Sequence, residues 1–158
     1  MIGINVHASN INGKGLGSTL IFKSLLPYLI KKIDTSRSYF FCSKQIEDDI
    51  KEDIHDIPHV FHSSFLPNMI YRFFECTFWI PKFNNSLPLL TFGDIPLRFK
   101  GKQILFLQNS LIVSKGNSIK DLKLYIMKII FKMNLKFVYK IIVQTDTMKK
   151  SLANNYLV

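Results

Sequence analysis

Cysteine and long apolar runs are scarce in this 158-residue chain, and each scarcity excludes a class of protein. Its two cysteines, Cys42 and Cys76, have neither the spacing of a zinc site nor the number of a disulfide framework, which favours a reducing compartment. No segment reaches the roughly 18 uncharged apolar residues of a membrane-spanning helix. The opening residues, MIGINVHAS, do not resemble an export signal. The sequence favours a cytoplasmic protein, at most peripheral on the inner face of a membrane.

Acidic residues are almost missing from the last third of the chain. Residues 1–99 contain 10 Lys or Arg and 9 Asp or Glu, whereas residues 100–158 contain 11 Lys and 2 Asp. The net charge of +10 therefore lies mainly in the last third, as in proteins that bind an anionic partner. A solvated basic surface explains the same composition, so charge alone leaves both interpretations open.

What is present is a regular alternation of strand and helix patterns. Strands are predicted at 2–8, 38–43, 59–65, 87–93, 102–109 and 141–145, and helices at 19–32, 44–54, 66–80, 119–140 and 146–156. The continuous apolar runs of the later strands are typical of a parallel sheet buried on both faces. We therefore predict one domain, 1–158, with a doubly wound, mainly parallel, Rossmann-like α/β fold whose ligands bind at the carboxyl ends of the strands.

A glycine-rich loop follows the first predicted strand. Gly13, Gly15 and Gly17 alternate in the stretch NGKGLGS, just before the first predicted helix. Such a loop can bring backbone N–H groups close to a phosphate at a helix N-terminus. The spacing matches neither the dinucleotide fingerprint nor the Walker loop, and glycines also serve simply as turn formers. Both roles stay open on the residues alone.

Polar residues at other strand ends are further candidates for ligand binding. His7 ends the first strand, Asp94 follows Gly93 after the fourth, and Gln108 and Asn109 end the fifth. Each has a structural alternative: a core histidine, a turn former, or ordinary hydrogen bonding at a strand end. The acidic residues of 47–56 fit a solvated helix face, and no His, Cys, Asp or Glu cluster has metal-ligand spacing, so no metal is predicted.

Four lysines recur at four-residue steps in the long helix predicted at 119–140. Lys128, Lys132, Lys136 and Lys140 would span about 120° of one helix, forming a broad basic face beside apolar residues. Such a face suits an anionic membrane surface, and a solvated face of a core helix explains it equally well. Nucleic acid is not an expected partner, because the exposed aromatic and arginine residues of a stacking platform are missing.

The order of these segments resembles the N-terminal domain of a GT-B glycosyltransferase of family 4. The resemblance rests on the glycine loop and on the stretches LLTFGDIP (89–96), KGKQILFLQNSLIV (100–113) and KIIVQTDTMKKSL (140–152), and it covers essentially the whole chain. It implies transfer of a sugar from a nucleotide-sugar donor to a surface-polysaccharide or lipid-linked acceptor, without a bound metal or other cofactor. It also implies that the glycine loop contacts the donor diphosphate.

The sequence departs from that family in two respects. Many members have a His-Asp pair where this chain has Gln108 and Asn109. Members also bind the donor mainly through a second Rossmann-like domain, for which this chain has no counterpart before Val158. The resemblance therefore implies an acceptor-side domain that is inactive alone: either the chain is a fragment or a split gene product, or a partner chain supplies the second half. A non-catalytic, membrane-peripheral subunit of the same fold is the alternative.

Overall fold

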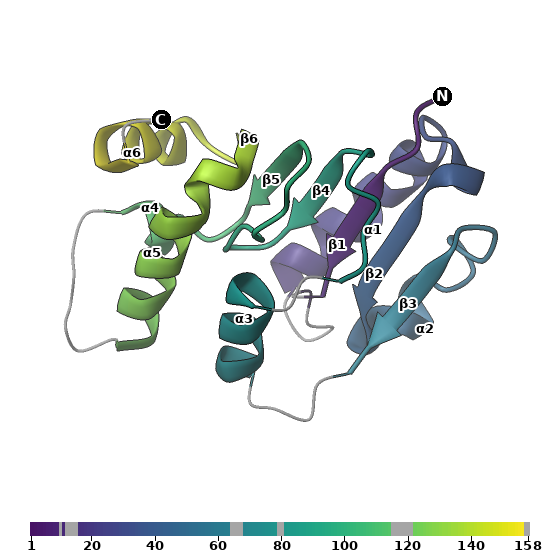
Figure 1. Cartoon of the computed structure of the whole chain (residues 1–158), viewed down its shortest axis with the longest axis horizontal. Helices are drawn as coiled ribbons and strands as arrows, with labels where there is room; N and C mark the ends of the chain where they lie inside the picture. Colours follow the sequence, from purple (N-terminus) through teal and green to yellow (C-terminus); the bar gives the residue numbers. More distant parts are fainter. Residues whose placement is uncertain (10, 12–15, 64–67, 79–80, 115–121, 157–158) are drawn as a thin grey trace.

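The structure is a computed structural model that describes residues 1–9, 11, 16–63, 68–78, 81–114 and 122–156 (Figure 1). Its strands are β1 (Asn5–Ala8), β2 (Tyr39–Ser43), β3 (His59–His62), β4 (Leu89–Phe92), β5 (Gln103–Leu107) and β6 (Val138–Val143). Its α-helices are α1 (Leu16–Ile30), α2 (Glu47–Ile50), α3 (Asn68–Thr77), α4 (Ser110–Val113), α5 (Leu122–Asn134) and α6 (Asp146–Tyr156). Short 3-10 helices are η1 (Thr35–Arg37), η2 (Lys44–Ile46) and η3 (Leu135–Phe137).

The strands form one parallel sheet in the order β3-β2-β1-β4-β5-β6. This is the predicted doubly wound, Rossmann-like α/β fold, and the structure confirms it. The chain adds strands outward from β1 in one direction and from β4 in the other, so the topological switch lies between these two strands. Ligands of such sheets bind outside the carboxyl ends of the strands at the switch.

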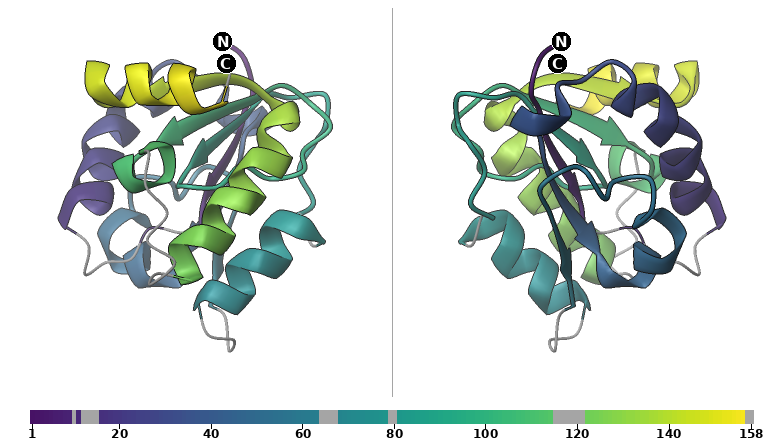
Figure 2. Two further views of the ribbon diagram at one scale, coloured as in Figure 1. Left: turned by 90° about the vertical axis from the view of Figure 1, so that its left-hand side faces the viewer. Right: turned by 90° about the vertical axis from the view of Figure 1, so that its right-hand side faces the viewer.

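The side chains of alternate residues in each strand point to opposite faces of the sheet. Val6 and Ala8 of β1 belong to the core under α1 and α2, together with Phe22 of α1. The intervening residue His7 points to the other face, which α3 and α5 cover (Figure 2). The two cysteines are separated in the same way, since Cys42 is buried in the first core and Cys76 in the second.

The helix predicted at 119–140 is shorter in the structure and ends at Asn134. The side-chain amide of Asn134 is buried and donates to the carbonyl oxygens of Cys76 (2.9 Å) and Pro96 (2.8 Å). After η3 the chain enters β6, which begins at Val138 and pairs with β5. Pairing with the sheet therefore outweighs the helical pattern of the sequence, and the strand predicted at 141–145 starts three residues earlier.

The predicted basic face of one helix is consequently wrong. Lys128 and Lys132 lie on α5, Lys136 lies in η3, and Lys140 lies in β6. Lys128 also donates to the carbonyl oxygen of Ser114 at 2.8 Å. The four lysines therefore belong to three different elements and cannot act as one helical stripe.

Candidate functional site

The carboxyl ends of β1 and β4 bring together the polar residues nearest the topological switch. His7 lies on β1, and Asp94 follows β4. Gly13 and Gly15 of the predicted phosphate loop lie outside the described residues, so their role stays a prediction. Gly17, the third glycine, lies inside α1 and not in the loop before it.

Gly17 has no steric reason to be glycine in this structure. A Cβ atom built on it meets no atom of the described residues within 4 Å. Glycine in a helix costs conformational entropy relative to alanine. We therefore expect Gly17→Ala to raise the free energy of unfolding by roughly 0.5 kcal/mol, as measured by urea denaturation. A loss of stability would show instead that this position needs the backbone freedom of glycine.

His7 forms a buried polar cluster with α3 and the residue after β1. Its Nε2 atom lies 2.9 Å from Oε1 of Glu75 and 3.0 Å from Oγ of Ser9. The same Oε1 accepts hydrogen bonds from Ser9 Oγ (2.8 Å) and from the hydroxyl of Tyr71 (3.0 Å). The other oxygen, Oε2, accepts from Nη1 of Arg72 at 2.6 Å. Each of these groups can therefore donate a hydrogen bond to the Glu75 carboxylate.

Helical spacing explains how α3 contributes three members of this cluster. Tyr71 and Arg72 precede Glu75 by four and three residues, so all three lie on one face of the helix. The His7 ring also stacks on Phe41, its partner on the neighbouring strand β2, with ring centroids 5.8 Å apart. Helix and sheet thus fix the imidazole and the carboxylate against each other.

The charges in the cluster keep Glu75 ionised although it is buried. Burial raises the pKa of the Glu75 carboxyl, but the neighbouring His7 and Arg72 and the hydrogen bonds outweigh it, so the pKa lies well below its ordinary value of 4.5. Burial and the adjacent carboxylate raise the pKa of Tyr71 above its ordinary value of 10.0, so its hydroxyl stays protonated and donates. Glu75 is therefore an anion that anchors its neighbours.

The geometry excludes a serine-protease type of triad. In a triad the histidine uses one ring nitrogen for the serine and the other for the acid. Here Ser9 and Glu75 both contact Nε2. An ionised carboxylate can only accept, so Nε2 carries the proton and cannot take one from Ser9. His7 and Glu75 are also fully buried, so neither can reach a substrate and both act by positioning.

Glu75 also positions Ser9 and Arg72; both residues are intermediate in exposure, and the Arg72 side chain is only 12% exposed. Nη1 of Arg72 is committed to Glu75 and lies 3.3 Å from Ser9 Oγ. Its second terminal nitrogen, Nη2, has no partner among the described residues. Nη2 is also buried, so it is not open to a ligand in this structure.

Asp94 and Asn109 join the ends of β4 and β5. Oδ1 of Asp94 accepts from the backbone N–H of Asn109 at 3.1 Å. Burial raises the pKa of Asp94 above its ordinary value of 3.8, although Arg72 opposes that shift. The side chain of Asn109 accepts from the N–H of Leu111 and so caps α4, a short helix absent from the prediction. Asn109 therefore has a structural role, whereas Asp94 is a perturbed carboxyl group at the switch.

Gln108 lines a hollow of about 430 Å³ at the carboxyl ends of β5 and β6. Among the residues that the structure describes, every polar residue of its wall has an uncharged hydroxyl or amide side chain: Gln108, Ser110, Ser114, Gln144, Thr145, Thr147 and Ser151. Nε2 of Gln108 is buried and has no partner among the described residues. The role of Gln108 in ligand binding stays a prediction.

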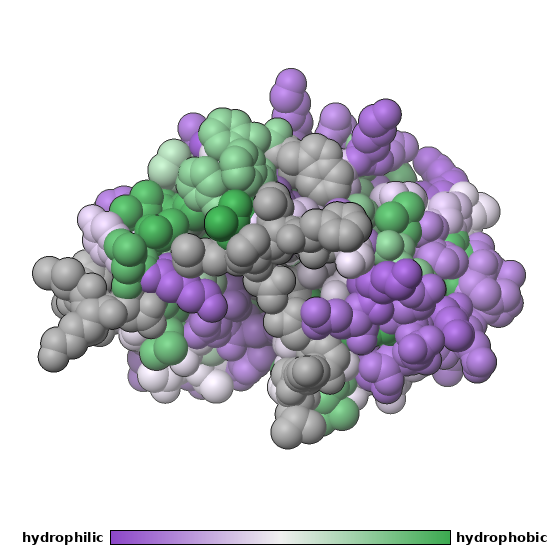
Figure 3. All heavy atoms as spheres, turned by 90° about the horizontal axis from the view of Figure 1, so that it is seen from below, coloured by the Kyte–Doolittle hydropathy of each residue, from purple (hydrophilic) through white to green (hydrophobic). Residues whose placement is uncertain are grey.

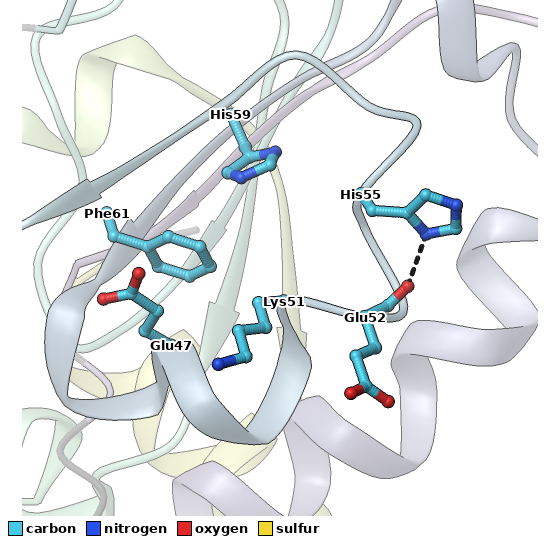
Figure 4. A pocket seen from close by; sticks show the side chains of 6 residues that line it. All are labelled: Glu47, Lys51, Glu52, His55, His59 and Phe61. Carbon is cyan, nitrogen blue, oxygen red and sulfur yellow. Dashed lines mark hydrogen bonds between the residues drawn. The ribbon is translucent and has the colours of Figure 1, made fainter.

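A second hollow lies at the sheet edge between α2 and β3 (Figure 4). It is lined by Glu47, Lys51, Glu52, His55, His59 and Phe61. Both histidines use Nδ1 for a nearby backbone carbonyl, His55 for Glu52 (2.6 Å) and His59 for Ile57 (2.7 Å). The side chains do not converge on a common point in Figure 4. Over the described part of the chain, no group of three or more His, Cys, Asp or Glu is placed to hold a metal ion.

Sequence reasoning found His7 but missed the α3 residues around it. Tyr71, Arg72 and Glu75 lie in the stretch NMIYRFFECT, where Arg72 and Glu75 are the only charged residues. Two opposite charges three residues apart in an otherwise apolar helix were the available signal. The contact between Glu75 and His7 could not be predicted from the sequence, because it joins residues 68 positions apart.

Comparisons with protein-family models, with curated proteins and with solved structures found no match to this chain. Of the helices that the structure describes, none has the length and apolar character required to cross a membrane.

Proposed function

We propose that this chain is the acceptor-side domain of a GT-B sugar transferase, which moves a sugar from a nucleotide-sugar donor to a surface-polysaccharide or lipid-linked acceptor. The observation that carries the proposal is the uncharged hollow around Gln108. A sugar presents several hydroxyl groups that both donate and accept hydrogen bonds. Hydroxyl and amide side chains have the same dual capacity, so this wall suits a carbohydrate better than an ion.

We assign two charged residues, Arg72 and Asp94, to the leaving diphosphate and to the proton of the acceptor hydroxyl. When the bond from the anomeric carbon to the diphosphate breaks, negative charge develops on the diphosphate, and we assign its stabilisation to Arg72, whose side chain is largely buried against Glu75. The acceptor hydroxyl loses its proton as its oxygen bonds to that carbon. Asp94 is suited to accept the proton, because its raised pKa makes it a stronger base than an ordinary aspartate.

Asp94 and the hollow are linked through the backbone. Asn109, whose N–H binds Asp94, directly follows Gln108 of the hollow. A sugar held by Gln108 would therefore lie at the same edge of the sheet as the proposed base. This link between the ends of β4 and β5 supports assigning the hollow to the acceptor.

The proposal is tested by saturation-transfer NMR of the purified chain. The probes are methyl glucoside, methyl galactoside, methyl N-acetylglucosaminide, UDP-glucose and GDP-mannose. We expect transfer to at least one of them, and an affinity about five- to tenfold lower in Gln108→Leu and Thr147→Val, which each remove hydrogen bonds of the hollow. Gln45→Leu, an exposed glutamine of η2, is the matched control and should bind normally.

Two results would contradict the assignment of the hollow to a sugar. One is the absence of saturation transfer to any of the five probes. The other is equal affinity in the chain, in Gln108→Leu and in Thr147→Val, because a sugar bound elsewhere would not depend on these side chains.

A further inference from the structure

The outer face of α3 is apolar although its inner face holds the polar cluster. Ile70, Phe73 and Phe74 are exposed on α3, and Phe78 follows them just beyond the helix. The three phenylalanine rings contact one another, with centroids 5.9 to 6.1 Å apart. Exposed aromatic residues gathered in this way are unusual on the surface of a soluble domain.

The neighbouring helix α5 extends this apolar surface. Leu122, Tyr125, Ile129 and Met133 are exposed at steps of three and four residues, so they form one stripe along the helix. A hollow of about 240 Å³ between the two helices is lined by Phe73 and Thr77 on one side and by Ile129 and Met133 on the other. Figure 3 shows hydrophobic residues gathered over this part of the molecule. We call these eight residues the α3–α5 face: Ile70, Phe73, Phe74, Phe78, Leu122, Tyr125, Ile129 and Met133.

The charged side chains that the structure describes around the α3–α5 face are basic. Lys123 and Lys132 are exposed on α5 and flank its apolar stripe on either side. Residues 58–158 contain 14 Lys or Arg and only four acidic residues: Glu75, Asp94, Asp121 and Asp146. Glu75 is buried, Asp94 is bonded to Asn109, and Asp146 lies on α6. No acidic side chain among the described residues belongs to α5 or to the outer side of α3.

We propose that the α3–α5 face docks on an anionic lipid membrane. Its phenylalanines would enter the boundary between headgroups and acyl chains, while Lys123 and Lys132 would meet the anionic headgroups. A second copy of this chain fits the face less well. A symmetric dimer would place the same lysines of both copies at one interface, where like charges repel. This inference goes beyond the proposed sugar transfer and does not depend on it.

Vesicle flotation tests the apolar part of the proposal. We expect the chain to bind vesicles of phosphatidylglycerol and phosphatidylcholine at low salt, and to bind much less to phosphatidylcholine alone or at high salt. The variant Phe74→Gln with Phe78→Gln should lower the partition coefficient at least about tenfold. Phe78 is 70% exposed and Phe74 is 47% exposed, so this variant should fold normally, which circular dichroism would verify.

A matched control removes two exposed apolar side chains from the opposite face of the sheet. Leu20 and Tyr28 of α1 are 65% and 71% exposed, and α1 lies on the other side of the sheet from α3 (Figure 2). Leu20→Gln with Tyr28→Gln should leave vesicle binding unchanged. Equal losses in the two double variants would overturn the assignment to the α3–α5 face.

A second pair of variants tests the charges. Lys123→Gln with Lys132→Gln should weaken binding to the anionic vesicles about tenfold or more. Lys31→Gln with Lys32→Gln removes the same charge just after α1 and should have a much smaller effect. The proposal is overturned if the unmodified chain ignores anionic vesicles at low salt. It is also overturned if ultracentrifugation shows a dimer that Phe74→Gln with Phe78→Gln dissociates, since the face would then pair two copies.

Discussion

Replacing Glu75 with glutamine is expected to lower the free energy of unfolding by about 3 kcal/mol or more. The carboxylate accepts from His7, Ser9, Tyr71 and Arg72, and it is fully buried. Removing one partner of a buried ion pair leaves the other charge without compensation, which typically costs about 3 to 5 kcal/mol. Urea denaturation followed by circular dichroism would measure the loss. Glu52→Gln, an exposed residue outside this cluster, should change stability by no more than about 0.5 kcal/mol.

The same variant should remove a specific part of the acid sensitivity of the fold. The folded-state pKa of Glu75 is depressed below 4.5, so its stabilisation is complete at neutral pH and is lost as the pH falls through the folded-state pKa. The difference in stability between the chain and Glu75→Gln should therefore shrink as the pH is lowered below about 4. A difference that is the same at neutral and acidic pH would show that the Glu75 charge is not the stabilising feature.

Asn134→Ala is the second substitution with a large expected effect, a loss of about 3 kcal/mol in the free energy of unfolding. The Asn134 amide donates to the carbonyl oxygens of Cys76 and Pro96, and its Oδ1 lies 3.4 Å from Nε of Arg98. Alanine would leave two carbonyl oxygens without their donor, and each unsatisfied buried group costs about 1 to 3 kcal/mol. The expected effect is large because this one amide joins α5 to the end of α3 and to the segment after β4.

The matched control for this substitution is Asn154→Ala, an exposed position on α6. The free energy of unfolding of this variant should lie within about 0.5 kcal/mol of that of the unmodified chain. Equal urea midpoints for Asn134→Ala and Asn154→Ala would contradict the role assigned to the buried amide.

Local signals in the sequence were sufficient for most of the fold. The helix predicted at 146–156 matches α6 over its full length, because Thr145 caps it by accepting from the N–H of Met148 at 3.2 Å. The strand at 102–109 was readable from its apolar run. The end of α5 was not readable, because the contacts that stop it at Asn134 come from Cys76 and Pro96, far away along the chain.

The same distinction applies to the candidate site. His7, Asp94 and Gln108 could be named from the sequence because each ends or follows a strand, and strand ends share one edge of a parallel sheet. Glu75 and Arg72 were missed although their opposite charges stand out in an apolar helix, because their contact with His7 depends on how α3 packs on the sheet. The inward side of α1 shows the same dependence on packing, since Phe22 and Leu26 are buried whereas Leu20 is exposed.

The position of α3 in the chain has a consequence for folding during synthesis. His7 precedes Glu75 by 68 residues, whereas Asn134 follows Cys76 by 58. When α3 leaves the ribosome, the partner of its polar side has already been made, but the helix that packs against its apolar side has not. We expect α3 to dock in two stages, first on β1 and later against α5, so that its phenylalanines are most accessible to other molecules in the interval between them.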